Sequence, residues 1–244
     1  MDLQLQQLLL DMADDSYRPG EEKEEGVYES DKTVSWAAYE RARRLSSVEL
    51  LPFLYDFVRC SSREDERGRA YFLVRCIAHN TNDLSAAEFL LDRLSVEKST
   101  ELIVNILDSL AEVFKPTHLD LSIIYKLIEK KGARIRRSAY SALTNSAHQA
   151  EDRLLDFLQN TVIVDDIVGI VRALGYIGTK KSVAPLARLL KSRKSEVKHT
   201  CQNTLPTIMV RENYPVTEIC RAAKVSTDYV QHRKERLELL TRPG

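Results

Sequence analysis

The feature that most constrains this chain is an internal repeat of 31–33 residues. An apolar residue recurs at this spacing near the end of each helix expected to be the first of a pair. These positions are Leu45, Ile77, Leu110, Leu143, Leu174 and Leu205. A second apolar cluster follows one helix further on, as in Phe89-Leu90 and Leu154-Leu155. Two helices per unit at this period are typical of an α-solenoid, in which stacked pairs share a continuous core.

The apolar residues between these positions predict helices and no sheet. Leu102, Ile103, Ile106 and Leu110 follow one another at intervals of one, three and four, which is the spacing of one buried helix face. Alternating segments typical of strands are absent, and only 8 of the 244 residues are Gly. We therefore predict an all-α chain built as an α-solenoid of stacked antiparallel helix pairs.

The chain divides into three predicted regions. Residues 1–32 should hold a short N-terminal helix and then a flexible acidic segment, because residues 13–32 lose apolar periodicity. Residues 33–211 carry the repeats. Residues 212–244 indicate two more helices, which either cap the solenoid or form a weak helix-turn-helix with its second helix in the DNA major groove. The cap is favoured, because Lys224 stands where that turn usually has Gly.

One stretch carries a family resemblance. Residues 173–178, Ala-Leu-Gly-Tyr-Ile-Gly, and residues 182–190, Ser-Val-Ala-Pro-Leu-Ala-Arg-Leu-Leu, resemble a HEAT repeat. The match is closest to the short repeats also found in phycobilisome lyases, and it is best over residues 134–198. The resemblance implies an armadillo-like helical superhelix that binds its partner on an inner, concave helix face. Armadillo and tetratricopeptide arrays are the alternatives, although the 34-residue tetratricopeptide period does not fit.

A formal net charge of zero hides a strong asymmetry. Residues 1–31 hold ten acids and two bases, whereas residues 126–244 hold 22 bases and 12 acids. Such separation produces a directional field that favours an acidic partner at the basic half. The predicted partner-binding residues are Arg134, Arg136, Arg137, Arg172, Arg188, Lys191, Arg193 and Lys194.

The second helix of each pair is expected to line the inner surface. The residues predicted on that surface are Asp56, Arg59, Asp92, Arg93, Tyr125, Lys126, Asp156, Gln159, Arg188 and Lys191. If the basic residues among the two sets project into one groove, nucleic-acid binding gains support, because phosphate contacts need Lys and Arg along one face.

Patterns that carry catalysis are missing. The five histidines have neither metal-ligand spacing nor a following Glu, the arrangement that holds iron in HEAT-fold deoxyhypusine hydroxylases. Phosphate-binding loops and nucleophile elbows are absent. The single Trp36 lies far from the basic half, unlike the tryptophans of HEAT-like DNA glycosylases. No catalytic, cofactor-binding or metal-binding residue is predicted.

The spacing of the cysteines and the lengths of the apolar runs indicate the cellular compartment of the protein. Cys60, Cys76, Cys201 and Cys220 have irregular spacing, which predicts reduced thiols and a cytoplasmic protein. No secretory signal or membrane-spanning run is recognised. We expect a non-catalytic scaffold or adaptor that binds a partner protein. This class includes inhibitors and immunity-type binders. The alternatives are a nucleic-acid-binding protein and, third, a HEAT-fold lyase or glycosylase; no oligomeric state is predicted.

Overall fold

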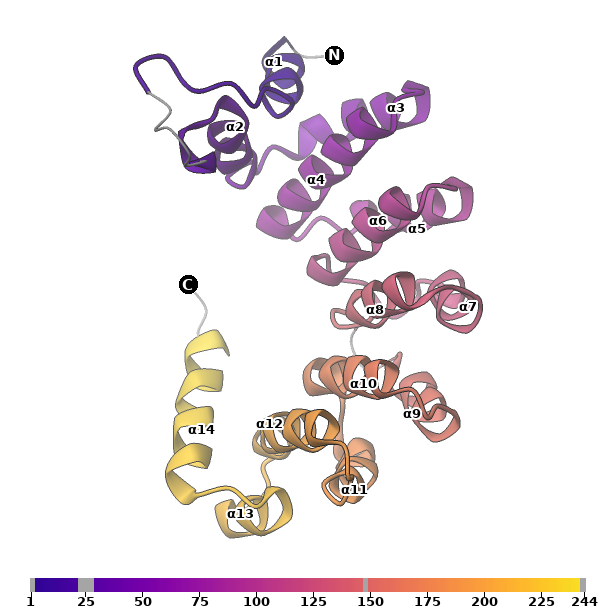
Figure 1. Ribbon diagram of the computed structural model, residues 1–244, viewed down its shortest axis with the longest axis vertical. Coiled ribbons are helices and arrows are strands. Elements are labelled where there is room, and N and C mark those ends of the chain that lie inside the picture. The colour runs from indigo at the N-terminus through magenta and orange to yellow at the C-terminus, as the bar shows by residue number, and fades with distance from the viewer. Residues whose placement is uncertain (1–2, 22–28, 147–148, 242–244) are drawn as a thin grey trace. The chain divides into compact units, whose positions relative to one another are not determined.

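The computed structural model describes residues 3–21, 29–146 and 149–241, and helices joined by short turns make up these ranges (Figure 1). The one strand-type pairing within them is an isolated bridge between Tyr17 and Thr33. The prediction of an all-α chain is confirmed.

The chain forms two compact units, residues 1–115 and residues 116–244. The first contains α1 (Leu3–Asp11), α2 (Val34–Ala42), α3 (Leu51–Cys60), α4 (Glu64–Thr81), α5 (Ser85–Val96) and α6 (Thr100–Glu112), with 3-10 turns at Ser30–Lys32 and Val48–Leu50. The second contains α7 (Ser122–Lys130), α8 (Ala133–Ala142), α9 (Glu151–Asn160), α10 (Val164–Ile177), α11 (Lys180–Leu189), α12 (Ser195–Arg211), α13 (Val216–Ala223) and α14 (Thr227–Thr241). The predicted repeat region 33–211 is divided between the units at the non-helical connection from α6 to α7.

The repeated apolar positions form the core of both units. Five of the six have fully buried side chains: Ile77, Leu110, Leu143, Leu174 and Leu205. Leu45 is only half-buried, because α2 ends at Ala42 and Leu45 lies in the connection that follows. The prediction that Leu110, Leu143 and Leu174 are buried is confirmed.

In the second unit the helices form two layers. The first helices of the pairs are α8, α10 and α12, and α10 contacts both α8 and α12. The helices α7, α9 and α11 form a second layer, in which α7 packs against α8, α9 against α10 and α11 against α12 (Figure 1). Successive second helices have far less contact with each other. The first helices therefore follow the shorter arc and form the inner layer of this unit, whereas the sequence analysis placed the second helices there.

Glycines explain this close approach. A Cβ on Gly169 of α10 would lie 2.7 Å from Cδ2 of Tyr140 on α8, and a Cβ on Gly175 would lie 3.2 Å from Cγ2 of Thr204 on α12. Only a residue without a side chain lets α10 approach both neighbours at these distances.

The end of α6 is held by a buried lysine. Lys115 is fully buried, and its Nζ donates hydrogen bonds to the carbonyl oxygens of Leu110 and Val113. These carbonyls lie at the C-terminus of α6, where backbone acceptors have no helical partner. Burial lowers the pKa of Lys115 to about 7.

The segment between α1 and α2 is partly described. The backbone N–H of Arg18 donates to the Lys32 carbonyl at 3.0 Å, and the Thr33 side chain caps α2 by accepting from the Trp36 N–H. Residues 22–28 of the predicted flexible segment lie outside the described residues, so its flexibility stays a prediction.

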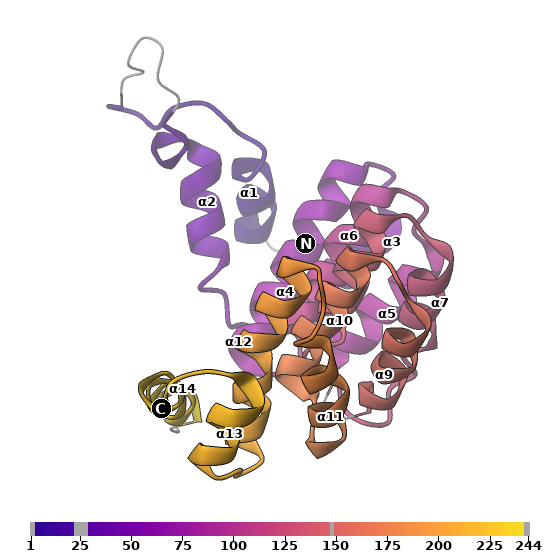
Figure 2. The same cartoon turned by 60° about the horizontal axis from the view of Figure 1, so that its bottom comes forward.

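Two helices follow α12 at the C-terminal end (Figure 2). α13 packs against α12, where the repeat expects a second helix, and α14 contacts both. Lys224 between α13 and α14 has φ 58°, the left-handed backbone that a Gly in this turn would take. The choice between a cap and a helix-turn-helix stays a prediction.

Candidate functional site

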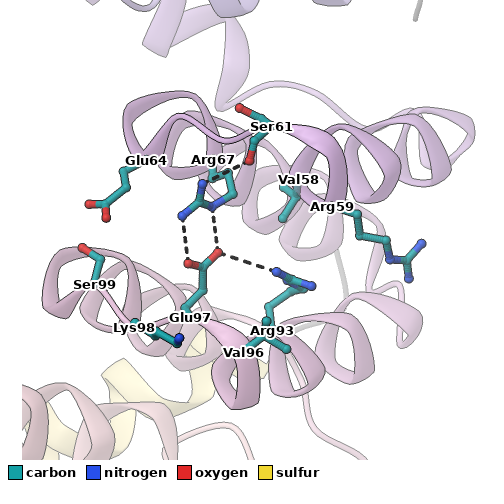
Figure 3. A pocket seen from close by; sticks show the side chains of 10 residues that line it. All are labelled: Val58, Arg59, Ser61, Glu64, Arg67, Arg93, Val96, Glu97, Lys98 and Ser99. Atoms are coloured by element: carbon teal, nitrogen blue, oxygen red, sulfur yellow. Dashed lines mark hydrogen bonds and ion pairs between the residues drawn. The ribbon is translucent and has the colours of Figure 1, made fainter.

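A pocket of about 270 Å³ lies in the first unit, where α3 and α5 end and α4 and α6 begin (Figure 3). Its lining residues are Val58, Arg59, Ser61, Glu64, Arg67, Arg93, Val96, Glu97, Lys98 and Ser99. Most of them are polar or charged, so the pocket suits a charged group better than an apolar ligand.

An ion pair between Arg67 of α4 and Glu97, which follows α5, is central to this pocket. Arg67 Nε and Nη2 donate to the two Glu97 carboxylate oxygens at 2.9 and 3.0 Å. Arg67 Nη1 donates to the Ser61 carbonyl at 3.1 Å, and the Tyr71 hydroxyl donates to Glu97 Oε1 at 2.7 Å. Two-point contact of this kind fixes orientation as well as charge.

The protonation of Glu97 follows from these contacts. Burial by itself would raise the pKa of Glu97, but hydrogen bonds from Arg67 and Tyr71, with the positive charges of Arg67 and Arg93, outweigh it. The net result is a pKa below the usual value, so the carboxylate is ionised at neutral pH. Burial is also the largest cause that raises the pKa of Tyr71, so this hydroxyl stays protonated and remains a donor.

Arg93 of α5 is held less completely than Arg67. Its side chain is 14% exposed, and its closest approach to the Glu97 carboxylate is 3.8 Å, too long for a hydrogen bond. Its Nε is buried and has no hydrogen-bond partner among the described residues. Arg93 and Arg67 converge on the same Glu97 carboxylate (Figure 3), and Arg93 also interacts with the Tyr71 hydroxyl.

The other lining charges leave an excess of positive charge. Arg59 is drawn away toward Asp56, at 3.3 Å, and lies over the Phe89 ring. Lys98 is exposed and forms no ion pair with the described part of the chain. Four cationic side chains line the pocket against two carboxylates, Glu64 and Glu97, and Asp56 outside the lining pairs with Arg59, so the excess is one positive charge.

A related ion pair joins α8 and α10 in the second unit. Arg136 Nε donates to Asp166 Oδ1 at 3.0 Å, and its Nη1 donates to the Lys131 carbonyl at 2.8 Å. The neighbouring Arg137 is exposed and lies 3.9 Å from the Asp165 carboxylate. Here two arginines face two carboxylates, so the charges balance.

The eight residues predicted to bind a partner do not gather on one face. Arg134, Arg136 and Arg137 lie on α8, and Arg172 lies on α10. Arg188 lies on α11 in the other layer, while Lys191, Arg193 and Lys194 lie in the connection from α11 to α12. Seven of the eight are exposed, and Arg136 is largely buried against Asp166.

A smaller set of these residues does share a surface. Arg134 and Arg137 are three residues apart on α8, and Arg137 meets Asp165 at the start of α10. Arg172 follows Asp165 by two helical turns, and Tyr176, 68% exposed, follows Arg172 by one turn, so the three share a face of α10. We call Arg134, Arg137, Arg172 and Tyr176 the basic stripe.

Sequence reasoning found part of the pocket and missed its centre. Arg59 and Arg93 were predicted on a ligand-facing surface, and both line the pocket. Arg67, Tyr71 and Glu97 were not singled out. The available signal was a repeated Arg-x-x-Ala-Tyr pattern at residues 67–71 and 136–140, with an acid 30 residues after each arginine.

Three further properties concern the described residues alone. No group of three or more His, Cys, Asp or Glu side chains within them could hold a metal ion. Within the same ranges, no helix combines the length and apolar composition needed to cross a membrane. The four cysteines are unpaired; Cys76 and Cys201 are buried, and Cys60 is exposed.

Comparisons with known proteins give a likeness of fold and no family. No protein-family model matches the chain, and no curated protein matches it. Among solved structures it is similar to a designed armadillo repeat protein in complex with the peptide (KR)4. The two are 15% identical with a TM-score of 0.48, over 83% of this chain and 98% of the designed one.

Proposed function

We propose that this protein is a non-catalytic helical-repeat scaffold or adaptor that binds an acidic partner protein through the basic stripe. A more specific version of this proposal is that the protein inhibits its partner, as an immunity-type binder does. Stacked helix pairs present long surfaces suited to protein binding. We also assign the pairs to the HEAT type, because each repeat has two helices, and keep the reducing cytoplasm as the predicted location.

The observation that supports this function best is the uneven charge of the basic stripe. The guanidinium groups of Arg137 and Arg172, on two adjacent helices, stand against one carboxylate, that of Asp165. Arginine binds carboxylates through two parallel hydrogen bonds. Tyr176 beside them adds an exposed aromatic ring, and Arg and Tyr are enriched among residues that carry binding energy at interfaces.

The remaining predicted residues have a different role in this proposal. Arg188, Lys191, Arg193 and Lys194 lie outside the stripe, so they attract an acidic partner over distance and speed its encounter without contacting it. Arg136 is a structural residue in this proposal, since it is largely buried and bonded to Asp166 and to the Lys131 carbonyl.

The test measures binding of a fluorescent octaglutamate peptide to the full chain at low and physiological salt. Arg137→Glu and Arg172→Glu should each weaken binding about three- to tenfold, as expected for partly exposed interface charges. Arg193→Glu is the charge-matched control outside the stripe, and it should have a clearly smaller effect. Equal effects of all three variants would show that only net charge matters and would contradict the stripe.

A duplex DNA of random sequence in the same assay separates the nucleic-acid alternative. If DNA binds more tightly than the peptide, and Lys191→Glu weakens it as much as Arg172→Glu does, the nucleic-acid function replaces this proposal. A steep decrease in DNA affinity with salt would accompany that result.

A further inference from the structure

We propose that one edge of the second unit binds the surface of an anionic lipid bilayer. This edge consists of the three turns that lead into α8, α10 and α12. Its exposed residues, which we call the membrane edge, are Lys131, Val162, Ile163, Lys191, Arg193 and Lys194. None of them belongs to the basic stripe, so this proposal stands apart from the proposed function.

The three turns lie side by side because α8, α10 and α12 run in the same direction. The ion pair between Arg136 and Asp166 joins α8 and α10 near their starts. Farther along, Gly175 of α10 faces Thr204 of α12, and these are the twelfth and tenth residues of their helices. Helices that meet at similar positions along their lengths also begin at the same edge.

The middle turn presents an apolar tip. Val162 is 91% exposed, the highest value among the large apolar side chains of the described residues, and Ile163 beside it is 48% exposed. The Ile163 N–H donates to Thr161 Oγ1 at 3.2 Å, which holds the turn around Val162. Two adjacent branched side chains in water are unfavourable, and the apolar boundary of a bilayer would bury both.

The two flanking turns carry cations that have no acid to pair with. All are exposed, and none forms an ion pair within the described ranges; they are Lys131 before α8 and Lys191, Arg193 and Lys194 before α12. Of the acids at this edge, Asp165 is paired with Arg137, and Glu196 in the first turn of α12 is exposed. Four cations less the Glu196 carboxylate leave an excess of three positive charges.

An anionic bilayer matches both parts of the membrane edge. Its headgroups attract Lys and Arg, and its apolar boundary accepts the tip. A nucleic acid or an acidic peptide would match the cations only and would leave Val162 in water. Each basic residue close to an anionic surface strengthens binding about fivefold, so three net charges should give about a hundredfold preference over a neutral bilayer.

The test is co-sedimentation of the full chain with vesicles of phosphatidylcholine alone and with vesicles of an equal mixture of phosphatidylcholine and phosphatidylserine. The mixed vesicles should bind about a hundredfold more tightly at low salt, and the preference should shrink at physiological salt. An absence of binding to the mixed vesicles would overturn the proposal.

Matched variants locate the binding surface. Val162→Ser should weaken binding about tenfold, because it removes an inserted apolar side chain, and Lys194→Glu should weaken it about tenfold or more, because it reverses a charge. Tyr176→Ser and Lys180→Glu are the controls, since both residues are exposed and lie at the other end of α10. Their effects should be clearly smaller at physiological salt, because the 14 residues of α10 span about 20 Å, more than a Debye length.

A fluorescent reporter tests insertion of the tip directly. Trp36 is the single tryptophan of the chain, so Val162→Trp in a Trp36→Phe background places one indole at the tip. Its emission should shift to shorter wavelength on the mixed vesicles and be quenched by brominated lipids. Unchanged emission together with unchanged affinity in Val162→Ser would mean that the tip stays in water, which contradicts the proposal.

Two further results would also overturn it. Equal losses in Lys194→Glu and Lys180→Glu would show that vesicles respond to net charge rather than to this edge. Duplex DNA that binds more tightly than the mixed vesicles, and loses affinity in Lys194→Glu, would assign the edge to nucleic acid instead.

Discussion

Two helix junctions, α4 with α6 and α8 with α10, share one residue pattern. They differ in whether the charges of their side chains balance. In each, the fourth residue of the first helix is an arginine that donates to a preceding backbone carbonyl and to a carboxylate 30 residues later. Arg67 and Arg136 are these arginines. A tyrosine follows one turn later in both, Tyr71 and Tyr140.

The difference lies in where the carboxylate is attached. Asp166 belongs to the first turn of α10, where the helix dipole favours an acid, and Asp165 beside it pairs with Arg137. Glu97 instead lies in the connection before α6, and a second arginine, Arg93, approaches it from α5. One junction is balanced, and the other has a surplus of positive charge around a pocket.

The tyrosines diverge in the same way. The Tyr71 hydroxyl donates to Glu97, whereas the Tyr140 ring packs against Gly169, the sixth residue of α10. The sixth residue of α6 is Asn105, whose Nδ2 donates to the Gly68 carbonyl at 3.3 Å. One repeat pattern can thus produce either close helix contact or a polar site, depending on a few neighbouring residues.

The largest difference between the junctions should appear when each carboxylate is neutralised. Glu97→Gln should cost about 3–5 kcal/mol of unfolding free energy, because it leaves two largely buried arginines without their acid. Asp166→Asn should cost about 1–2 kcal/mol, since only Arg136 loses its acid there and Arg137 keeps Asp165. Urea unfolding measures both, and equal losses would erase the distinction between the junctions.

The cores of the two units should respond alike. Leu110→Ala and Leu143→Ala remove fully buried side chains at equivalent repeat positions. Each should cost about 2–5 kcal/mol from lost burial and the remaining cavity. Urea unfolding of both variants tests this, and a much smaller loss at either site would mean that the shared repeat does not hold the two units equally.

Replacing glycine by alanine should change stability in opposite directions in the two units. Gly169→Ala places a methyl group 2.7 Å from the Tyr140 ring and should destabilise by about 1–3 kcal/mol. Gly68→Ala meets no atom closer than 3.6 Å and should stabilise by up to about 1 kcal/mol through better helix propensity. Thermal unfolding of the two variants shows the contrast, and a loss of stability in Gly68→Ala would contradict it.

The smallest expected effect is a change in unfolding free energy at acidic pH. The pKa of Glu97 is lower in the folded protein than its ordinary value of 4.5, so its contribution to stability is full above that value and is lost as pH falls through the folded pKa. The stability gap between the wild type and Glu97→Gln should therefore narrow below about pH 4. Urea unfolding at pH 7, 5 and 3.5 tests this, with Asp166→Asn as the comparison.

The sequence predicted those features that a periodic apolar pattern controls. The helical class and the buried positions Leu110, Leu143 and Leu174 follow from spacing alone, because burial of one helix face repeats along the chain. The inner layer of the second unit did not follow, since it depends on contacts of Gly169 and Gly175 with helices about 30 residues away in sequence.

The candidate sites were predicted only in part, for a similar reason. A charge count identified a basic half of the chain. It did not show that Arg136 bonds to Asp166 while Arg93 Nε has no hydrogen-bond partner, because these contacts depend on distances between repeats. The Arg-x-x-Ala-Tyr pattern shows which arginines connect repeats. It does not show how far a second arginine stands from the shared carboxylate.

The buried amine at the end of α6 has a kinetic consequence. With its pKa near 7, Lys115 is partly uncharged at neutral pH and is intrinsically a good nucleophile, yet it is fully buried. An acylating reagent can reach it only when the end of α6 opens, because Nζ is bonded to the carbonyls of Leu110 and Val113. The rate at which Lys115 is labelled therefore reports how often this end of the helix unravels while the rest of the molecule stays folded.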